Sequence, residues 1–206
     1  MQAAGAEEQN TQAGRPSVKA AIEQAAARLF AEQGFGATGV QQIVDAAGVN
    51  KAMLYYYFRG KEPLYDALIG QGLALLQSAV CVAEQDLNLP VDKRLKRFLA
   101  TYLSLVAGNP DLAQIIYREA LRVGEHERPA AVVQFRECVR RLAAVLESCA
   151  GELDTDTDFT LAAYSLFGMA NMFIQRYVVT REALDVAPLV EHIVDLFLYG
   201  AGAKNY

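Results

Sequence analysis

Residues 51–58 hold the side chains of this chain that are best suited to contact nucleic acid: a lysine, a methionine and three consecutive tyrosines. An ammonium group and phenol hydroxyls can donate hydrogen bonds to phosphate oxygens. Aromatic rings and small apolar groups, such as those of Ala52 and Met53, can contact thymine methyl groups in the major groove. The residue types in this segment therefore predict contact with double-stranded DNA.

Helical geometry decides which of these side chains face outward. Leu54 and Phe58 lie four positions apart and define the inward face of a helix. At about 100° per residue, Tyr56 points nearly opposite that face, with Tyr55 and Tyr57 on either side. Contiguous exposed rings indicate a contact surface. The alternative is an aromatic collar packed on a neighbouring helix, although the three rings spread over too wide an arc for all to be buried.

A second short helix must precede and position this one. Apolar residues recur at i, i+3, i+4 and i+7 through residues 40–47, which predicts an amphipathic helix of about two turns. Gly48 follows the last buried position, where a left-handed conformation ends the helix. Asn50 can then cap the next helix with its side chain. The pair forms a helix-turn-helix, whose second helix enters a DNA major groove.

A longer helix further upstream completes a three-helix unit, which we expect to span residues 16–61. Ser17 can cap that helix, and Gly34 can stop it. Its apolar stripe consists of Ile22, Ala26, Leu29 and Phe30. Residues 1–15 have little apolar content and predict a disordered tail, with Arg15 as a minor-groove arm being the alternative.

The stretch from about Val18 to Leu68 resembles the TetR family of bacterial transcriptional regulators. The residues that carry the resemblance are Ile22, Ala26, Leu29-Phe30-Ala31-Glu32-Gln33-Gly34-Phe35, Ala37-Thr38, Val40, Ile43, Ala46-Ala47-Gly48-Val49, Lys51, Leu54-Tyr55-Tyr56, Phe58, Lys61-Glu62 and Leu64. The resemblance implies a homodimer in which a helix-turn-helix domain precedes a helical domain for effector binding and dimerisation.

The resemblance also implies roles for single residues. The positions that would face bases are Lys51, Ala52, Met53 and Tyr55. The positions that would hold phosphates are Thr38, Tyr56, Tyr57 and Lys61. Family members often carry a basic residue where Gln41 and Gln42 stand. We expect Gln41 to contact DNA as well. The exchange removes positive charge from the docking surface.

Composition and charge fit the same class of protein. The chain has 206 residues, of which 53% are hydrophobic, and few turn clusters, which predicts an all-α fold. Its net charge is −5, yet residues 15–61 carry six bases and three acids, and the part from Glu62 onward carries −6. A locally basic segment on an acidic body is typical of a DNA-binding regulator.

Localisation follows from what the sequence lacks. The N-terminus shows no signal peptide, and Cys81, Cys138 and Cys149 are too scattered for a disulfide framework. Buried thiols in a reducing cytoplasm are expected, with a redox switch as the alternative. The longest apolar run, 159–180, contains Asn171, Gln175 and Arg176, which favours a buried helix of a soluble protein over a membrane span.

The second domain is expected to span residues 62–206. Helices are predicted at about 62–85, 92–107, 110–123, 128–150, 156–180 and 187–201. Asn109-Pro110-Asp111 predicts a capped helix start, as does Asp154 or Thr155. Gly70 and Gly72 weaken the first of these helices and predict either close helix packing or a flexible joint.

The last two helices predict a dimer interface. Two hairpins related by a two-fold axis would form a four-helix bundle. The residues that we expect in this interface are Phe159, Leu166, Phe173, Tyr177, Leu189, Ile193, Leu196 and Phe197. Packing of the same residues within one chain is the alternative.

The same region predicts an effector site. Asn171 and Gln175 place two amides on an otherwise apolar helix, where they need water, backbone, the dimer mate or a ligand as partners. A cavity with apolar walls and Asn171 as polar anchor would suit a small, largely apolar molecule. Its expected lining consists of Tyr102, Tyr117, Phe135, Tyr164, Met169, Asn171, Met172 and Gln175. An ordinary core with the amides bonded at the dimer seam is the alternative.

The sequence offers little support for catalysis. His126 and His192 are the only histidines and have no metal-ligand spacing, and no phosphate-cradling or nucleophile motif is present. We therefore expect no cofactor and no metal. The predicted function is a DNA-binding repressor that a small effector releases from a palindromic operator. A helical adaptor that uses the tyrosine face for protein contact, and a small helical enzyme, are the rival classes.

Overall fold

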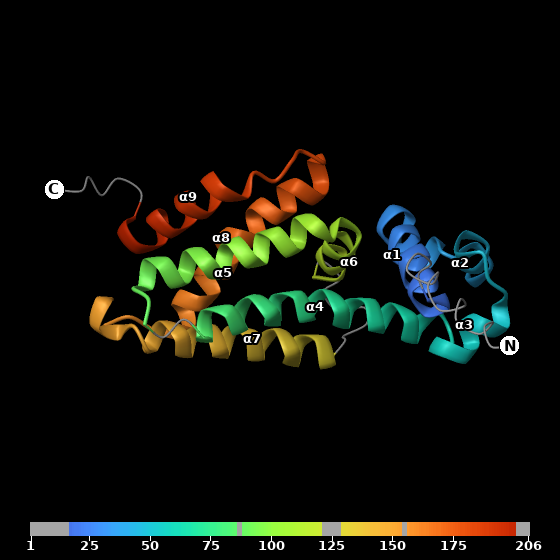
Figure 1. Cartoon of the computed structure of the whole chain (residues 1–206), viewed down its shortest axis with the longest axis horizontal. Coiled ribbons are helices and arrows are strands. Elements are labelled where there is room, and N and C mark those ends of the chain that lie inside the picture. Colours follow the sequence, from blue (N-terminus) through green and yellow to red (C-terminus); the bar gives the residue numbers. More distant parts are fainter. Residues whose placement is uncertain (1–16, 86–87, 121–128, 154–155, 201–206) are drawn as a thin grey trace, which may run out of the picture. The chain divides into compact units, whose positions relative to one another are not determined.

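The computed structural model describes residues 17–85, 88–120, 129–153 and 156–200, and within these ranges the regular structure is helical throughout (Figure 1). The chain divides into two compact units, Met1–Tyr65 and Asp66–Tyr206. The division falls within a long helix, four residues beyond the boundary expected from the sequence. The all-α fold is confirmed.

The first unit contains α1 (Val18–Ala37), α2 (Val40–Ala47) and α3 (Lys51–Phe58). The predicted local signals are all present. The Ser17 hydroxyl accepts a hydrogen bond from the Ala20 N–H at 3.2 Å. Gly34 interrupts α1 with φ 83°, and Gly48 ends α2 with φ 66°. Both values lie in the left-handed region that favours glycine.

Rings and aliphatic side chains from these helices form the core of the first unit. Ile43 and Leu54 are fully buried, so α2 and α3 each turn one apolar side toward α1. Phe30 and Phe35 of α1 pack on Tyr65, with ring centroids 5.1 and 4.9 Å from the tyrosine ring. This core fixes α3 relative to α1 and leaves its other side exposed.

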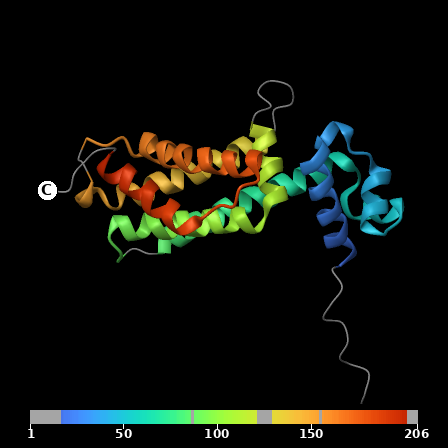
Figure 2. The ribbon, with the colours of Figure 1, turned by 90° about the horizontal axis from the view of Figure 1, so that it is seen from above.

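The second unit contains most of a helix that begins in the first unit, five further α-helices and a short 3-10 turn. These elements are α4 (Lys61–Gln85), α5 (Val91–Gly108), α6 (Pro110–Ala120), α7 (Pro129–Glu147), η1 (Ala150–Glu152), α8 (Phe159–Thr180) and α9 (Val186–Tyr199). Within this unit α7 packs along α8 and α9 packs along α5 (Figures 1 and 2).

Two helix starts differ from the sequence-based expectation. The Asn109 side chain donates back to Leu105 O at 2.8 Å, so it closes the end of α5 and does not cap α6. Asp158 caps α8, since its carboxylate accepts from the N–H groups of Thr160 and Leu161. The predicted caps Asp154 and Thr155 lie outside the described residues.

A buried arginine joins three helices of the second unit. Arg94 of α5 is only 2% exposed. Its guanidinium donates to Ala83 O of α4 at 3.0 and 3.2 Å, to the Ser148 hydroxyl at 2.8 Å and to the Cys149 sulfur at 3.0 Å. A buried cation needs such partners. Arg94 therefore holds the end of α4 against α5 and the end of α7.

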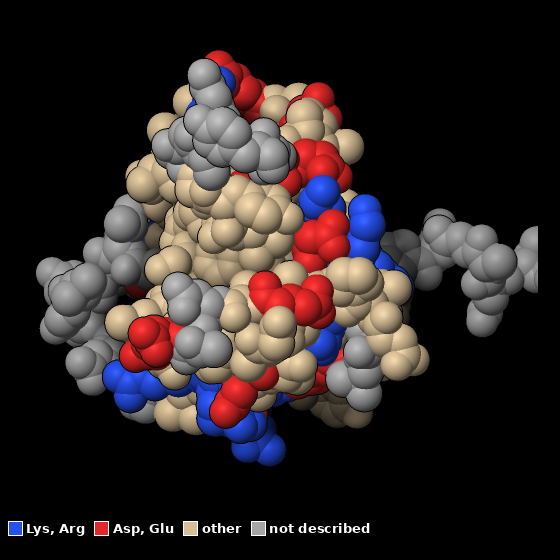
Figure 3. All heavy atoms as spheres, turned by 90° about the vertical axis from the view of Figure 1, so that its left-hand side faces the viewer, with Lys and Arg blue, Asp and Glu red and all other residues tan. Residues whose placement is uncertain are grey.

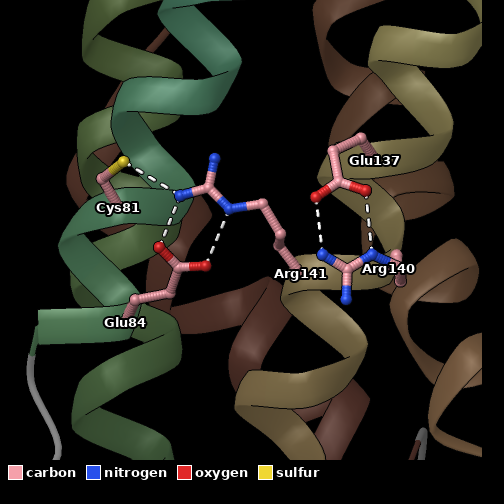
Figure 4. Close-up of polar contacts among 5 residues, drawn as sticks. All are labelled: Cys81, Glu84, Glu137, Arg140 and Arg141. Atoms are coloured by element: carbon pink, nitrogen blue, oxygen red, sulfur yellow. Dashed lines mark hydrogen bonds and ion pairs between the residues drawn. The ribbon is translucent and has the colours of Figure 1, made fainter.

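A second arginine clamps α4 to α7 closer to the surface (Figure 4). The Arg141 guanidinium donates to both carboxylate oxygens of Glu84 and to the Cys81 sulfur at 3.0 Å. The hydrogen bonding from Arg141 to the Glu84 carboxylate holds the pKa of that carboxyl below its ordinary value. The neighbouring Glu137 and Arg140 pair with each other along α7 and reach no other helix in the same view.

Glycine permits a close contact between α4 and α6. A Cβ atom added at Gly72 would lie 2.7 Å from Ile116 Cγ1, whereas one added at Gly70 would meet nothing within 4 Å. Of the two readings of these glycines, close packing applies to Gly72 and does not apply to Gly70.

The surface of the second unit carries the acidic excess of the sequence. On the face in Figure 3, acidic side chains gather among uncharged ones, with basic side chains between them.

Among the described helices, α4 alone is long and apolar enough to cross a membrane, with a mean hydropathy of 1.4 in an 18-residue window that is 39% buried.

Candidate nucleic-acid interface and effector region

Caps at both ends hold α3 as a rigid short helix. The Asn50 side chain accepts from the Met53 N–H at 3.0 Å, as predicted. At the other end, the Arg59 N–H donates to Tyr55 O at 3.0 Å, and Arg59 has a left-handed conformation. The ammonium group of Lys19 on α1 lies 5.9 Å from the centre of the Phe58 ring. Both ends of α3 are therefore capped, and its buried Phe58 lies close to a cation of α1.

The outward face of α3 presents the tyrosines. Tyr56 is 78% exposed, Tyr55 51% and Tyr57 41%, while Leu54 is fully buried. The Tyr56 and Tyr57 rings meet edge to face at 5.0 Å, so they support each other. No neighbouring helix in the described part of the chain buries them as a collar. Lys51, Ala52 and Met53 are also exposed.

The two glutamines of α2 have local partners. The Gln42 side chain accepts from the Gly39 N–H at 2.7 Å and thereby caps the start of α2. The Gln41 amide donates to Asp45 at 2.7 Å on the exposed surface. Gln42 thus has a structural reason to stand where relatives often carry a base, and Gln41 stays accessible at the surface.

Thr38 does not match the phosphate-binding role expected for it. Its side chain is 1% exposed, and its hydroxyl donates to Gly34 O at 2.8 Å and to Leu29 O at 3.3 Å. The hydroxyl thereby satisfies carbonyls at the end of α1. Because the hydroxyl is buried against these carbonyls, we expect no phosphate contact from this side chain.

Lys61 is also directed inward. Its ammonium group donates to Phe35 O at 2.9 Å and to Thr38 O at 2.8 Å, and lies 4.3 Å from the centre of the Phe35 ring. Two of its three N–H donors are therefore used within the first unit. The family resemblance assigned Lys61 to the DNA backbone, and the sequence gave no sign of these contacts.

In the second unit, aromatic rings meet around Phe167 of α8. The centroids of Phe98, Phe135 and Tyr102 lie 5.6, 5.8 and 6.3 Å from that ring. The Tyr102 hydroxyl donates to the Asn171 side-chain oxygen at 3.2 Å, and burial raises the pKa of Tyr102 well above its ordinary value. Asn171 thus has a partner inside its own chain.

The predicted effector residues divide between two sides of α8. Tyr102, Tyr117, Phe135 and Met169 are half-buried against the core, and Gln175 is half-buried as well. Tyr164 and Met172 instead lie on the outer surface, and Met172 is 63% exposed. These two residues do not line an interior cavity of one protomer, and their part in effector binding stays a prediction.

The predicted dimer interface needs a correction at two positions. Leu166 and Ile193 are fully buried in the core of the protomer, so they have no surface left for a partner. The remaining residues of that set are half-buried: Phe159, Phe173, Tyr177, Leu189, Leu196 and Phe197. The apolar residues that α8 does expose are Leu161, Tyr164, Met172 and Val179. Both faces of α8 are apolar, and the predicted dimer interface included Leu166 from the face that packs into the core.

A pocket of about 310 Å³ lies where the end of α8 meets the start of α9. Its walls include Phe173, Tyr177, Leu189 and His192, and the Arg176–Glu182 ion pair lies at the same site. None of the residues predicted to bind an effector lines it. Three residues predicted for the dimer interface do.

A capped, outward-facing α3 on a three-helix unit defines the class of helix-turn-helix DNA-binding proteins. Residues 22–68 match the model of the N-terminal domain of "Bacterial regulatory proteins, tetR family". Residues 88–180 match the "Tetracyclin repressor-like, C-terminal domain". The chain belongs to the TetR family. It is a DNA-binding transcriptional regulator and not an enzyme.

Two curated relatives show how far the similarity extends. The HTH-type transcriptional repressor NicS of Pseudomonas putida is 30% identical over 107 residues, which are 52% of this chain and 50% of that protein. The fatty acid metabolism regulator protein of Bacillus subtilis is 24% identical over 198 residues, 92% of this chain and 98% of that protein. The match to NicS thus spans about half the length of either protein.

Solved structures share the whole fold. The regulator FadR from Bacillus subtilis in complex with stearoyl-CoA superposes with a TM-score of 0.72 at 24% identity, covering 88% of this chain and 98% of that one. The fatty acid degradation regulator FadR from Bacillus halodurans gives a TM-score of 0.73 at 23% identity, covering 92% and 99%. At these identities the similarity establishes the fold.

Proposed function

We propose that the protein is a cytoplasmic, homodimeric repressor that a small, largely apolar effector releases from a palindromic operator. The observation that carries this proposal is the outward face of α3, where three tyrosines are exposed on a helix capped at both ends. Contiguous aromatic surface of this kind marks a binding site. A rigid helix can place such side chains against base edges and phosphates.

A library of genomic DNA duplexes tests DNA binding and yields the operator. We expect a set of bound sequences that share an inverted repeat, with half-sites separated by whole helical turns. Changes of Met53 or Tyr55 to alanine should alter the preferred base pairs. Tyr56→Phe, which removes only a hydroxyl, should weaken binding to all sequences alike. Absence of any enriched sequence from the wild-type selection would contradict the proposal.

The homodimer is proposed to form through α8 and α9. Leu161, Met172 and Val179 leave an exposed apolar stripe along α8, and such a stripe is costly in water unless a partner covers it. A second copy related by a two-fold axis would cover both stripes and the pocket at the start of α9. Such a dimer would present two α3 helices to one operator.

The effector is proposed to enter the aromatic cluster around Phe167. The cluster offers apolar walls, and the Tyr102–Asn171 hydrogen bond supplies a polar group that a ligand can take over. The relative named as a fatty acid metabolism regulator, and the FadR structure with stearoyl-CoA, make a long acyl chain the first effector class to test. The ligand must bind the DNA-free shape more tightly, since equal affinity for both shapes would not release DNA.

Thermal shift measurements with acyl-CoA esters and with apolar and aromatic metabolites should identify a stabilising ligand, which is then tested for operator release. Asn171→Leu and Tyr102→Phe should weaken the response to that ligand while leaving operator binding intact. Ser104→Ala, an exposed position of α5, serves as the control. A full response in both variants would place the effector elsewhere.

A further inference from the structure

The pocket at the start of α9 shares no residue with the aromatic cluster around Phe167. It occupies about 310 Å³ where the end of α8 turns into the start of α9 (Figure 1). That volume lies at the lower end of the range for sites that hold small molecules. The residues of its walls lie between positions 173 and 192, so a single protomer forms the pocket.

Aromatic rings in fixed positions form part of the pocket wall. Phe173 and His192 meet edge to face, with their ring centroids 6.4 Å apart. The Tyr177 hydroxyl donates to Ala107 O of α5 at 3.4 Å, so a contact outside the pocket holds its ring in place. The face of an aromatic ring attracts a cation electrostatically. The wall therefore suits a positively charged ligand.

The charged groups at the pocket leave one negative charge without a counter-ion. Arg176 donates from Nε and Nη2 to one carboxylate oxygen of Glu182, at 2.9 and 2.6 Å, so this cation is already paired. Asp185 is the N-cap residue of α9, yet its side chain accepts no cap hydrogen bond and forms no ion pair with the described residues. With His192 neutral, one base stands against two acids at the pocket.

These features decide between the classes of ligand that a pocket of this size can hold. An anion would meet two carboxylates, and Arg176 could bind it only after losing Glu182. A neutral apolar molecule would take water from the Asp185 carboxylate without replacing the hydrogen bonds lost. A cation with an apolar body gains from the unpaired carboxylate and from the rings alike.

We propose that this pocket binds a small organic ammonium ion, with Asp185 as its counter-ion and the rings of Phe173 and Tyr177 against its apolar body. The inference goes beyond the proposed function, because it adds a second ligand site apart from the effector site. In the proposed dimer, a second copy would cover the pocket and the bound ion.

Calorimetric titration of the full-length protein tests this site in the absence of DNA. The probe is benzyltrimethylammonium chloride, and sodium chloride at the same concentration controls for ionic strength. Benzyl alcohol supplies a ring without charge, and phenylacetate supplies a ring with the opposite charge. The variants are Asp185→Asn, Phe173→Leu and Asp195→Asn, the last removing an exposed acid of α9 outside the pocket as a charge-matched control.

Wild type should bind the ammonium ion more tightly than benzyl alcohol and should not bind phenylacetate. Asp185→Asn should keep the start of α9, since asparagine serves at an N-cap as well as aspartate does. It should bind the ammonium ion about fivefold more weakly, the effect of one charge pair in water. Phe173→Leu should weaken binding by about two- to fivefold. Asp195→Asn should bind like wild type.

Equal binding of the ammonium ion and benzyl alcohol, or no binding of the ion by wild type, overturns the proposal. So does an equal loss in Asp195→Asn and Asp185→Asn, which would indicate net charge alone. Wild-type affinity in both Asp185→Asn and Phe173→Leu would place the ion elsewhere. If Phe173→Leu fails to fold in thermal unfolding, Asp185→Asn decides by itself.

The variant Leu161→Glu, designed to be monomeric, separates a ligand site from a seat for the partner. It should bind the ammonium ion as wild type does, because one protomer supplies the pocket walls. Binding by Leu161→Glu alone would contradict the proposal, since the partner would then fill the pocket of wild type. DNA takes no part in these titrations, so they fail or succeed independently of the proposed repressor function.

Discussion

Single buried polar side chains hold the turn between α1 and α2. Thr38 has its hydroxyl bonded to two carbonyls of α1, and Lys61 bonds the carbonyl of the same threonine. Two of the four residues that the family resemblance placed on phosphates, Thr38 and Lys61, thus support the three-helix unit through contacts within it. For Thr38, the effect on DNA binding is expected to follow from its effect on folding.

Thr38→Val is therefore expected to act on stability. Valine has nearly the same shape but leaves Gly34 O and Leu29 O without the buried hydroxyl, which costs about 1 kcal/mol. Urea unfolding measures the change. Thr180→Val removes an exposed hydroxyl bond to Arg176 O and should change stability by less. The structural role of Thr38 would be refuted if Thr38→Val left stability unchanged and reduced the salt dependence of DNA binding.

The Glu84–Arg141 pair predicts a pH dependence of stability. The pKa of Glu84 is lowered in the folded protein from an ordinary value of 4.5, so its contribution is present above pH 4.5 and is lost as the pH falls through the lowered pKa. Because solvent screens this partly exposed pair, Glu84→Gln should cost below about 1 kcal/mol at pH 7.

At a pH below the lowered pKa of Glu84, Glu84→Gln and wild type should approach each other in free energy of unfolding. Urea titrations at the two pH values give the comparison. Glu137→Gln, which breaks the exposed pair with Arg140 within α7, is the control and should have no resolvable effect at either pH. An equal loss at both pH values in Glu84→Gln would exclude the charge as its cause.

At the scale of elements, α4 contains one glycine, Gly72, whose surroundings leave no room for a side chain, and another, Gly70, whose surroundings do. Gly72→Ala would place a methyl group 2.7 Å from Ile116 Cγ1, near the root of that side chain, and should destabilise the protein by about 1–3 kcal/mol. Gly70→Ala meets nothing and should stabilise the helix by about 1 kcal/mol. Thermal unfolding of both variants is the measurement.

The same glycine pair distinguishes packing from flexibility. If α4 required a flexible joint at both glycines, both alanine variants would impair the release of DNA by an effector. We expect only Gly72→Ala to change the response, because it alone displaces α6 from α4. Equal signs of the stability change at the two positions would contradict this account.

At the scale of the whole molecule, the exposed stripe of α8 predicts the oligomeric state. Leu161→Glu and Met172→Glu place charges on surfaces that are both 63% exposed in the protomer, so the fold should tolerate them while a dimer interface should not. Light scattering should change from twice the chain mass to 22.5 kDa. Operator affinity should fall with it.

Two observations would count against an interface on this stripe. One is a wild-type protein that is already monomeric at micromolar concentration. The other is a dimer that survives both glutamate variants. Val132→Glu on α7, also exposed and apolar, controls for a general effect of surface charge.

The sequence by itself determined the short helices of the first unit and the face of α3 that is exposed. A 3.6-residue period, Gly48 in a left-handed turn and the Asn50 cap are local features, and they lead directly to the exposed tyrosines of α3. Each depends on residues within a few positions of one another. The family resemblance rests on the same short stretch, and it extended the prediction to the second domain.

Only the tertiary structure decided which side chains turn inward where both directions are chemically reasonable. Lys61 can hold a phosphate or a carbonyl, and the carbonyls it binds lie more than twenty positions earlier in the chain. The Asn171 side chain accepts a hydrogen bond from Tyr102, which lies 69 positions earlier in the chain. On α8 both faces are apolar, so periodicity cannot choose between them. Packing within the second unit buried Leu166 and left Met172 exposed. Long-range contacts of this kind leave no local pattern in the sequence.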